Sequence, residues 1–500
     1  MKLSDFLGTE NLARAVDKAV GIFSPEAYAK RTRIREQVRL YDGATKGRRG
    51  AGFRKLQDGP RDGIKSLATL RQRSRDFSRN NGYAVKAVNA IASNTIGTGI
   101  VLELKGTRAN SRDLPLKDAW KSWSESTDCD FAGLTTFAGI QELVMKGLAE
   151  SGEVFIRRRI LDSKYFKRTG KIPLKLQVLE PEYLADSKDS YSYKGNQNEV
   201  VSGIEFTPEG ERVAYHFYKR HPSLGGTIET VRVPADEVIH LFRLDRPDQI
   251  RGVPWGAPVL LNLMDLDGYE DAEILRRKIA ACYAAFVTEP EIDDTIGKPE
   301  EENALIDRME PGMIEVLPQG KTVTFGTPPQ VTGYAEFPTS ILHKISAGYQ
   351  VPYSVLTGDF TQVNFSSGRM GWLEFQRLIE QWRWNMIVPR MLDPIFGWFS
   401  FVSELVGISA KPYTKTWTAP RREMIDPLKE IQAILLGVKG GLQSLPEAIR
   451  ELGYDPDEVI EQIKEHNSKL DSAGVILDSD PRQDPKRLAA KKVAGQKESG

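Results

Sequence analysis

The period of the hydrophobic pattern changes at Gly152, and this change constrains the fold more than any other feature. Before it, apolar residues recur at helical spacing from Leu70 to Ile96 and again from Thr136 to Glu150. After it, four runs have the strand period of two: Val154–Ile160, Leu174–Leu179, Val213–Tyr218 and Val238–Phe242. These short runs are separated by long polar loops. The sequence therefore predicts an α+β domain whose sheet is mixed or antiparallel.

Local signals place the ends of the early helices. Asn80-Asn81-Gly82 predicts a break between two helices, and Gly97-Thr98-Gly99 predicts the end of the second. A further helix is expected over Leu116–Ser124. The helix over Thr136–Glu150 is expected to begin after Thr135-Thr136 and to end at Ser151-Gly152.

The second half of the chain is mainly helical. Strand-like runs are expected at Ala285–Thr288, Met313–Leu317 and Thr322–Phe325, with an acidic helix over Pro299–Met309 among them. The other helices are expected over Pro258–Ala285, Thr339–Tyr349, Ser367–Val406, Pro427–Gly437, Leu445–Leu452 and Pro456–Leu470. Pro389 and Pro394 should kink the longest of them. The last thirty residues are rich in Lys, Asp, Ser and Gly and are expected to be disordered.

Charge is distributed unevenly although the net charge of the 500 residues is only +1. Residues 30–79 hold sixteen Lys and Arg against five Asp and Glu, whereas residues 289–310 hold nine acids and two bases. This polarity suggests different partners at different ends of the chain. The basic segment suits contact either with nucleic acid or with an acidic neighbouring subunit.

Cysteine usage and hydropathy bear on compartment. Cys129 and Cys282 lie far apart and predict neither a disulfide framework nor a zinc site. The N-terminus does not have the pattern of a secretory signal, so synthesis in the cytoplasm is expected. The apolar stretch from Met386 to Val406 is interrupted by charges and prolines, and no membrane-spanning segment is predicted.

A search for catalytic patterns predicts no catalytic residue, no metal site and no cofactor. The chain has no phosphate-binding glycine motif and no metal-binding spacing among its five histidines. Ser151-Gly152-Glu153 lacks a recognisable histidine partner, and His216 and His240 are expected to be structural residues on strands. One alternative is a cation site formed by Glu125, Asp128 and Asp130, which would suit a metal-dependent nuclease.

The segment from Leu356 to Arg369 is a polar loop with two glycines that leads into the long helix. Ser366 or Ser367 is expected to cap that helix by accepting from its first amides. The aromatic residues that follow, including Trp372, Phe375 and Trp382, form a stripe that predicts a buried face, with nucleobase stacking as the alternative.

The order of these motifs resembles that of the portal proteins of tailed bacteriophages, in their lambda-like branch. Four segments carry the resemblance: Leu70–Asn81, Asn94–Gly99, His240–Trp255 and Val351–Arg369. Ser151–Arg157 and Tyr269–Glu273 are secondary matches. The resemblance covers about residues 65–410.

The resemblance implies a portal fold with an α/β wing, a helical stem, a small β-containing clip and a helical crown. The implied division is a basic N-terminal arm at 1–64, the wing at 65–257, stem helix 1 at 258–285, the clip at 286–335, stem helix 2 at 336–350, a tunnel-loop region at 351–368, a long kinked wing helix at 369–410, the crown at 411–470 and a disordered tail at 471–500.

The same resemblance implies a ring of about twelve subunits at one capsid vertex, through which DNA is packaged and ejected. The implied partners are double-stranded DNA, the terminase large subunit, the major capsid and scaffolding proteins and a head-completion or adaptor protein. Such a protein is made in the bacterial cytoplasm and located in the virion. It is not an enzyme, because ATP hydrolysis would belong to the terminase.

The residues implied to line the DNA channel are Thr361, Gln362, Val363, Asn364, Phe365 and Ser366, with Lys344 and Arg369 as candidate channel cations. Those implied to face the terminase are Glu291, Asp293, Asp294, Glu300, Glu301 and Glu302. Two other functions remain open from the residues alone: the metal-dependent nuclease, and a binding scaffold that forms no ring.

Overall fold

The computed structural model describes residues 64–106, 115–189, 198–224, 229–281, 285–288, 322–325, 336–408, 413–420, 424 and 426–475. The chain divides into two compact units, Met1–Asp62 and Gly63–Gly500, and all of these residues belong to the second. The six acidic residues predicted to face the terminase, the helix predicted over Pro299–Met309, the strand predicted over Met313–Leu317, and Cys282 lie outside the described residues. So do nearly all of the basic arm and most of the predicted tail.

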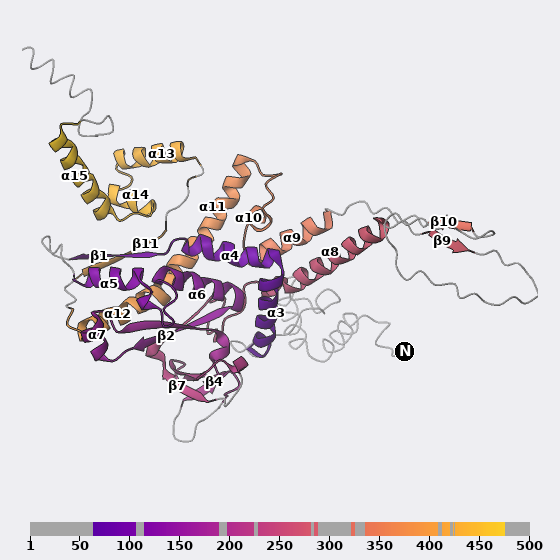
Figure 1. Cartoon of the computed structure of the whole chain (residues 1–500), viewed down its shortest axis with the longest axis horizontal. Coiled ribbons are helices and arrows are strands. Elements are labelled where there is room, and N and C mark those ends of the chain that lie inside the picture. Colours follow the sequence, from indigo (N-terminus) through magenta and orange to yellow (C-terminus); the bar gives the residue numbers. More distant parts are fainter. Residues whose placement is uncertain are drawn as a thin grey trace, which may run out of the picture. The chain divides into compact units, whose positions relative to one another are not determined.

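The described helices and strands confirm the α+β class (Figure 1). The helices are α3 (Leu67–Asn80), α4 (Gly82–Ile96), α5 (Pro115–Glu125), α6 (Phe137–Ser151), α7 (Ser163–Thr169), α8 (Leu260–Ala281), α9 (Glu336–Tyr349), α10 (Tyr353–Thr357), α11 (Phe365–Trp382), α12 (Asp393–Leu405), α13 (Pro427–Lys439), α14 (Leu445–Glu451) and α15 (Pro456–Ala473). The strands are β1 (Val101–Gly106), β2 (Glu153–Ile160), β3 (Leu174–Leu179), β4 (Glu199–Val201), β5 (Ile204–Phe206), β6 (Arg212–Tyr218), β7 (Thr230–Pro234), β8 (Val238–Phe242), β9 (Ala285–Thr288), β10 (Thr322–Phe325) and β11 (Tyr413–Thr418).

The predicted helix ends are confirmed by their capping contacts. The Asn81 side chain accepts from the amides of Tyr83 and Ala84 at the start of α4. Thr136 caps α6, and Gly152 ends that helix at φ +88°. A Cβ on Gly152 would lie 2.3 Å from the carbonyl carbon of Val253, so this site requires glycine for close approach as well as for its left-handed backbone.

All of the described strand pairs are antiparallel. The sequence predicted either a mixed or an antiparallel sheet, and the structure has the antiparallel kind. The strands form sheets in the orders β3-β2-β8, β4-β5-β6-β7, β1-β11 and β9-β10. The β1-β11 pair was not predicted from the sequence. Its register aligns Val101 with Thr418, so it joins segments separated by more than three hundred residues.

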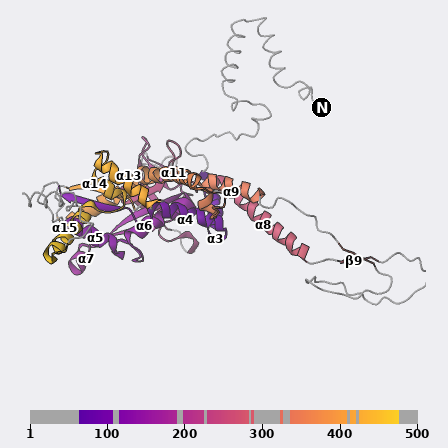
Figure 2. The ribbon, with the colours of Figure 1, turned by 90° about the horizontal axis from the view of Figure 1, so that it is seen from above.

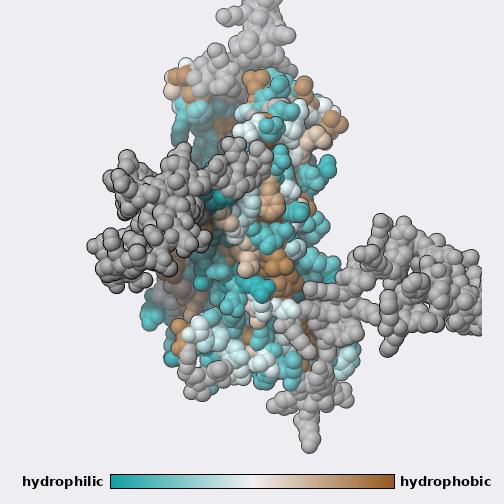
Figure 3. Space-filling view, turned by 90° about the vertical axis from the view of Figure 1, so that its right-hand side faces the viewer, coloured by the Kyte–Doolittle hydropathy of each residue, from teal (hydrophilic) through white to brown (hydrophobic). Residues whose placement is uncertain are grey.

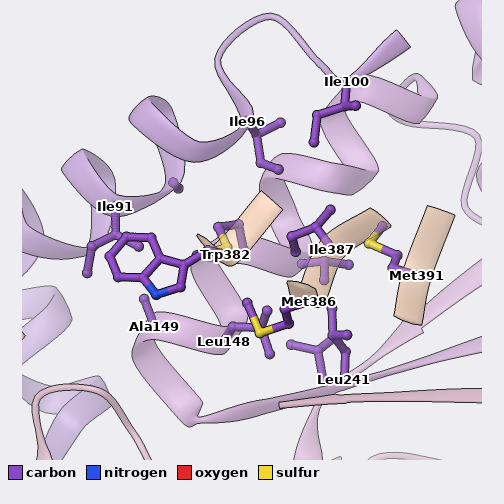
Figure 4. Packing of buried hydrophobic residues seen from close by; sticks show 14 of the residues in the cluster. Ile91, Ile96, Ile100, Leu148, Ala149, Leu241, Trp382, Met386, Ile387 and Met391 are labelled. Carbon is purple, nitrogen blue, oxygen red and sulfur yellow. The ribbon is translucent and has the colours of Figure 1, made fainter. Parts of the chain in front are cut away.

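Strand β2 contributes to two hydrophobic clusters. Val154 and Ile156 belong to the larger cluster with helices α4 and α6, whereas Phe155 belongs to the smaller one with Tyr215 and Phe217. Successive strand side chains point to opposite faces, so β2 is buried on both. Figure 4 shows part of the larger cluster, where Trp382, Met386 and Ile387 meet side chains of α4 and α6.

The long helix predicted from Ser367 to Val406 differs from the prediction in its middle. Between α11 and α12 the chain forms a π-helical segment, Arg383–Leu392, which contains Pro389. Pro394 lies in the first turn of α12. The chain stays helical from Phe365 to Leu405, and its hydrogen-bonding period changes in the segment that contains Pro389.

Helices α8 and α9 lie side by side (Figure 2). The rings of Tyr269 on α8 and Phe337 on α9 are 4.6 Å apart. Farther along the chain, α15 reaches Ala473, so the tail predicted to begin at residue 471 starts inside a helix. Within the described residues, no helix combines the length and hydropathy that a membrane crossing needs.

Candidate functional site

A short exposed loop, Gly358–Asn364, joins α10 to α11. Its polar residues Thr361, Gln362 and Asn364 are exposed, Phe360 is 62% exposed, and Val363 is half-buried. Apart from Asp359 the loop has no charged side chain. Figure 3 shows hydrophilic and apolar residues intermixed over one face of the described chain.

The loop is tied down by its own hydrogen bonds. The Asp359 carboxylate accepts from the Thr361 amide at 2.9 Å and from the Thr361 hydroxyl at 2.6 Å, and these bonds lower the pKa of Asp359. The Val363 amide donates to the Phe360 carbonyl at 3.0 Å. Gly358 ends α10 at φ +74°, a conformation that glycine adopts without strain. The loop is thus a defined pair of turns.

Asn364 caps α11, and this corrects the prediction that Ser366 or Ser367 would do so. Its side chain accepts from the Ser367 amide at 2.8 Å, while the Ser367 hydroxyl accepts from the Asn364 amide at 3.1 Å. This reciprocal pair is a capping box. Helix α11 therefore begins at Phe365. Phe365 and Ser366 lie in its first turn, and the loop is shorter than the predicted 351–368, which also contains α10.

The loop is mounted on buried structure. The Val351 amide donates to the Ser346 carbonyl at 3.1 Å, which fixes the turn between α9 and α10. The rings of His343 and Tyr353 stack 4.2 Å apart. Helix α10 also contacts α4. The exposed residues of the loop therefore extend from a short helix that packs against α4 and α9.

The two predicted cations flank the loop in sequence, and both are exposed. Lys344 lies on α9 and Arg369 on the second turn of α11, and neither forms an ion pair with a described residue. The pKa of Asp426 is lowered chiefly by the hydrogen bond from Lys429 and, to a smaller degree, by the charge of Arg369. Arg369 therefore lies within electrostatic reach of the start of α13.

The aromatic stripe of α11 is core, as predicted. Phe375 is 1% exposed, and the ring of the buried Trp382 lies 4.7 Å from that of Trp255. Stacking of these rings on a nucleobase would require them to leave the core. Trp372 is half-buried and packs 6.1 Å from Phe375.

A second constellation, missed from the sequence, centres on Glu153. The Arg251 guanidinium donates from Nε to both carboxylate oxygens at 2.9 and 3.0 Å, and the Gly252 amide donates at 2.8 Å. His240 Nε2 lies 3.0 Å from Glu153 Oε2, and Arg71 lies 3.4 Å from Oε1. The expectation that Glu153 has no histidine partner is therefore wrong.

The protonation states of this cluster follow from burial and pairing. Burial raises the pKa of Glu153, but the charge of Arg251 and the hydrogen bond from His240 outweigh it and hold this pKa well below its usual range. Burial lowers the pKa of His240 to about 4. A neutral His240 therefore donates to an ionised Glu153. Nothing in this arrangement supplies a nucleophile, and we assign the cluster a structural role.

This cluster brings together four segments that are separate in sequence. Arg71 and Arg75 of α3 contact Glu182, Glu153 begins β2, and Arg251 follows β8. The sequence signal was an acidic residue directly before the apolar run Val154–Ile156, because a buried charge needs a partner. The sequence alone did not show which residues pair with Glu153.

The acids considered for a nuclease site are not assembled as one. Asp128 accepts from Lys171 at 2.8 Å, and Asp130 caps the amide of Leu134 at 2.8 Å. Among the described residues, the group whose ligand atoms are close enough to share a cation is Glu180, Glu182 and His221, which excludes Glu125. Arg75 already contacts both glutamates of that group.

Comparison with known proteins gives one family. Residues 46–383 match the model described as phage portal protein, lambda family. A probable portal protein of Halomonas phage phiHAP-1 is 26% identical over 82% of each chain. Portal protein B of Escherichia phage lambda is 21% identical over 81% of this chain and 84% of its own.

Solved structures give lower similarity. A chain from the neck of a native gene transfer agent particle, computed with C12 symmetry, is 16% identical with a TM-score of 0.46 and covers 79% of this chain and 94% of its own. A portal protein of the HK97 family from Corynebacterium diphtheriae is 10% identical with a TM-score of 0.32, over 72% and 97%.

Proposed function

Because the chain belongs to the lambda family of phage portal proteins, we propose that it forms the ring through which the phage genome is packaged and ejected. In this proposal about twelve copies assemble around a closed cyclic axis at one vertex of the capsid, so the protein is part of the virion. The ring nucleates head assembly and contacts the major capsid and scaffolding proteins. It performs no ATP hydrolysis of its own.

The observation that carries the proposal is the composition and mounting of the loop Gly358–Asn364. Duplex DNA carries one phosphate charge per about 1.7 Å of helix axis, and a densely basic lining would hold it tightly. Thr361, Gln362 and Asn364 offer exposed hydroxyl and amide groups without positive charge. A fixed turn of this kind suits contact with passing DNA at low friction.

Lys344 and Arg369 are proposed as the sparse positive charges near this loop. Each is exposed and forms no ion pair with a described residue, so its charge is available to phosphate or to a neighbouring subunit. Lys344 precedes the loop in the sequence and Arg369 follows it. This order supports two rings of positive charge in the assembly, one formed by each residue. Arg369 has the additional neighbour Asp426, which reduces the charge it offers.

The remaining roles follow the order of the elements. We propose that α8 and α9 are the two stem helices and that the paired strands β9 and β10 belong to the clip. The acidic clip residues Glu291, Asp293, Asp294, Glu300, Glu301 and Glu302 would face a basic surface of the terminase large subunit. After packaging, a head-completion or adaptor protein would bind the same end of the ring.

Imaging of the purified protein tests the assembly. We expect negative-stain images to show annular particles, with a mass that corresponds to a closed ring of the chain. A stable monomer under assembly conditions, with no annular particles, would overturn the portal function.

The role of the loop is tested by excision of Thr361 and Gln362. The bond from the Val363 amide to the Phe360 carbonyl brings the ends of this turn together, and Asn364 is kept because it caps α11. A matched control removes Pro208 and Glu209 from the turn between β5 and β6, which is closed by the bond from the Gly210 amide to the Thr207 carbonyl at 2.9 Å.

We expect both variants to form rings. DNA packaging and retention should fall only in the variant that lacks Thr361 and Gln362, because only this variant shortens the proposed lining. Normal packaging and retention by that variant would disprove the contact role of the loop.

A further inference from the structure

Helix α13 carries an apolar seam that no described residue of its own chain buries. Leu428, Ile431, Leu435 and Val438 follow the spacing i, i+3, i+7 and i+10 of a coiled-coil a/d pattern. Leu428 is 68% exposed and Leu435 is 51% exposed, and no residue of α13 is buried against the described part of the chain. Such a seam on a folded helix indicates a partner.

Helix α15 carries a second seam of the same kind. Ile460, Ile463, Asn467 and Leu470 repeat the same spacing, and Ile463 is 51% exposed. A single polar residue at an a position, here Asn467, is a known device for fixing the register of a helix pair. Both helices thus present coiled-coil seams of about three turns.

Helices α13 and α15 are attached to the same region of the fold. Each contacts α14 (Figure 1), and α14 lies close to the β1-β11 pair, where Arg450 Nε lies 3.5 Å from the buried Glu103. Lys105 on β1 forms an ion pair of 2.9 Å with Asp457 of α15. An adjacent side of α13 supplies Glu430 and Ile434 to a cavity of about 570 Å³ beside α11.

The two helices also have opposite charge. Helix α13 contains two Lys and one Glu, whereas α15 contains five Asp and Glu against two Lys. Net charges of opposite sign favour pairing of α13 with α15 over pairing of α15 with itself, because like-charged α15 helices repel.

We propose that α13 of one copy packs along α15 of the next copy in the ring. This inference rests on the proposed function, because a cyclic assembly needs two different complementary surfaces on each subunit. Each subunit then offers α13 to one neighbour and α15 to the other, and the contacts close around the ring. The seams are exposed in one chain because their partners belong to other chains.

Crosslinking with paired cysteines tests which helices meet. The double variant Leu435→Cys with Ile463→Cys is prepared in a Cys282→Ser background, in which the remaining Cys129 is buried, and assembled rings are treated with a short bismaleimide. We expect a ladder of multimers on denaturing gels. The control pair Ala433→Cys with Ile463→Cys places the first thiol on an exposed position opposite the seam and should give no ladder.

The other outcomes separate the competing arrangements. A dimer from the single variant Leu435→Cys would mean that α13 pairs with itself, and a crosslinked monomer from the double variant would mean pairing within one chain. Either result overturns the inference, as do rings without any ladder. If the unmodified chain forms no rings, the proposed function falls and this inference falls with it.

A charge placed in the seam gives an independent measurement. Leu435→Glu should raise the concentration needed for half-assembly by at least about tenfold, because a carboxylate would be desolvated between the two helices. Ala433→Glu introduces the same residue outside the seam and should leave that concentration unchanged. Equal assembly of the two variants would overturn the inference, and circular dichroism of both confirms that each is folded.

Discussion

At the scale of single residues, the Glu153 carboxylate joins α3, β2 and the segment after β8. It accepts from Arg251, His240 and the Gly252 amide, and all of these groups are removed from solvent. A buried ion pair adds little to stability relative to an apolar pair, but loss of one partner leaves the other charge unpaired. Replacement of Glu153 alone should therefore destabilise the fold, because its buried partner Arg251 keeps its charge.

We predict that Glu153→Gln lowers the free energy of unfolding by about 3–5 kcal/mol, because it leaves Arg251 buried without a counter-charge. Urea denaturation of the subunit, followed by circular dichroism, measures the loss. Glu142→Gln is the matched control, since Glu142 forms an exposed i, i+4 pair with Lys146 on α6. The control should change stability by no more than about 0.5 kcal/mol. Similar losses in both variants would contradict the structural role of Glu153.

The lowered pKa of His240 predicts a pH dependence. Between pH 6.5 and about 4 the unfolded chain protonates this histidine and the folded chain does not, so stability falls as the pH falls through this window. The slope attributable to one such group is at most about 1.4 kcal/mol per pH unit.

Thermal unfolding midpoints at a series of pH values check this prediction. His240→Gln should flatten the dependence between pH 4 and 6.5, whereas His466→Gln on the exposed face of α15 should leave it as in the unmodified chain. An unchanged slope in the His240 variant would show that the histidine does not titrate differently in the two states.

At the scale of elements, the π-helical segment is the joint that fastens the long helix to the rest of the fold. Arg383, at its first position, donates from Nε to the Thr95 carbonyl at 2.7 Å and from an Nη to the Asn94 carbonyl at 2.8 Å. These carbonyls belong to the last turn of α4, where a cation also meets the negative end of the helix dipole. Arg390 similarly donates to the Phe242 carbonyl at 2.8 Å.

We predict that Arg383→Ala lowers the free energy of unfolding by about 2–4 kcal/mol, since two charge-assisted bonds to carbonyls are lost and the last turn of α4 is uncapped. Arg377→Ala, on an exposed position of α11, should cost less than about 0.5 kcal/mol. The comparison uses urea denaturation, and hydrogen exchange of the α4 amides should show faster exchange at its C-terminal end only in the Arg383 variant. Equal exchange in both would contradict this capping.

At the scale of the whole molecule, the proposed ring multiplies the effect of any change in the loop by the number of subunits. One cation per chain would add about twelve positive charges around the channel, and binding to phosphate depends steeply on their number and on salt. The absence of positive charge from the loop therefore matters mainly in the assembled ring.

We predict that Gln362→Arg rings bind duplex DNA more tightly than the unmodified rings, that this difference disappears at high salt, and that packaging slows. Gln362→Asn, which keeps the amide, should behave as the unmodified protein does. The measurements are retention of DNA by purified rings at several salt concentrations and the rate of packaging. Identical retention by the two variants at low salt would contradict a position of residue 362 at the DNA.

Local signals in the sequence predicted much of the fold. The change of period at Gly152 marked the passage from α6 to β2, and Asn81, Thr136 and Gly152 marked helix ends that the structure confirms. The burial of Phe375 and Trp382 was also predictable, because helical spacing fixes which side chains share a face. The family could also be recognised from the sequence, because the order of its short motifs can be read along the chain.

Pairings between distant segments could not be predicted in this way. Strand β11 meets β1, Glu153 meets Arg251, and Arg383 caps α4, each through contacts whose partners lie far apart in the chain. The choice of Asn364 over Ser366 or Ser367 as cap depended on backbone geometry that composition does not encode.

By itself, then, the sequence determined the periods, most of the helix ends and the absence of positive charge from the loop, because these depend on neighbours within a few residues. Only the tertiary structure decided which buried charges are paired and which apolar seams are left exposed. Burial and desolvation are set by segments that meet only when the chain is folded.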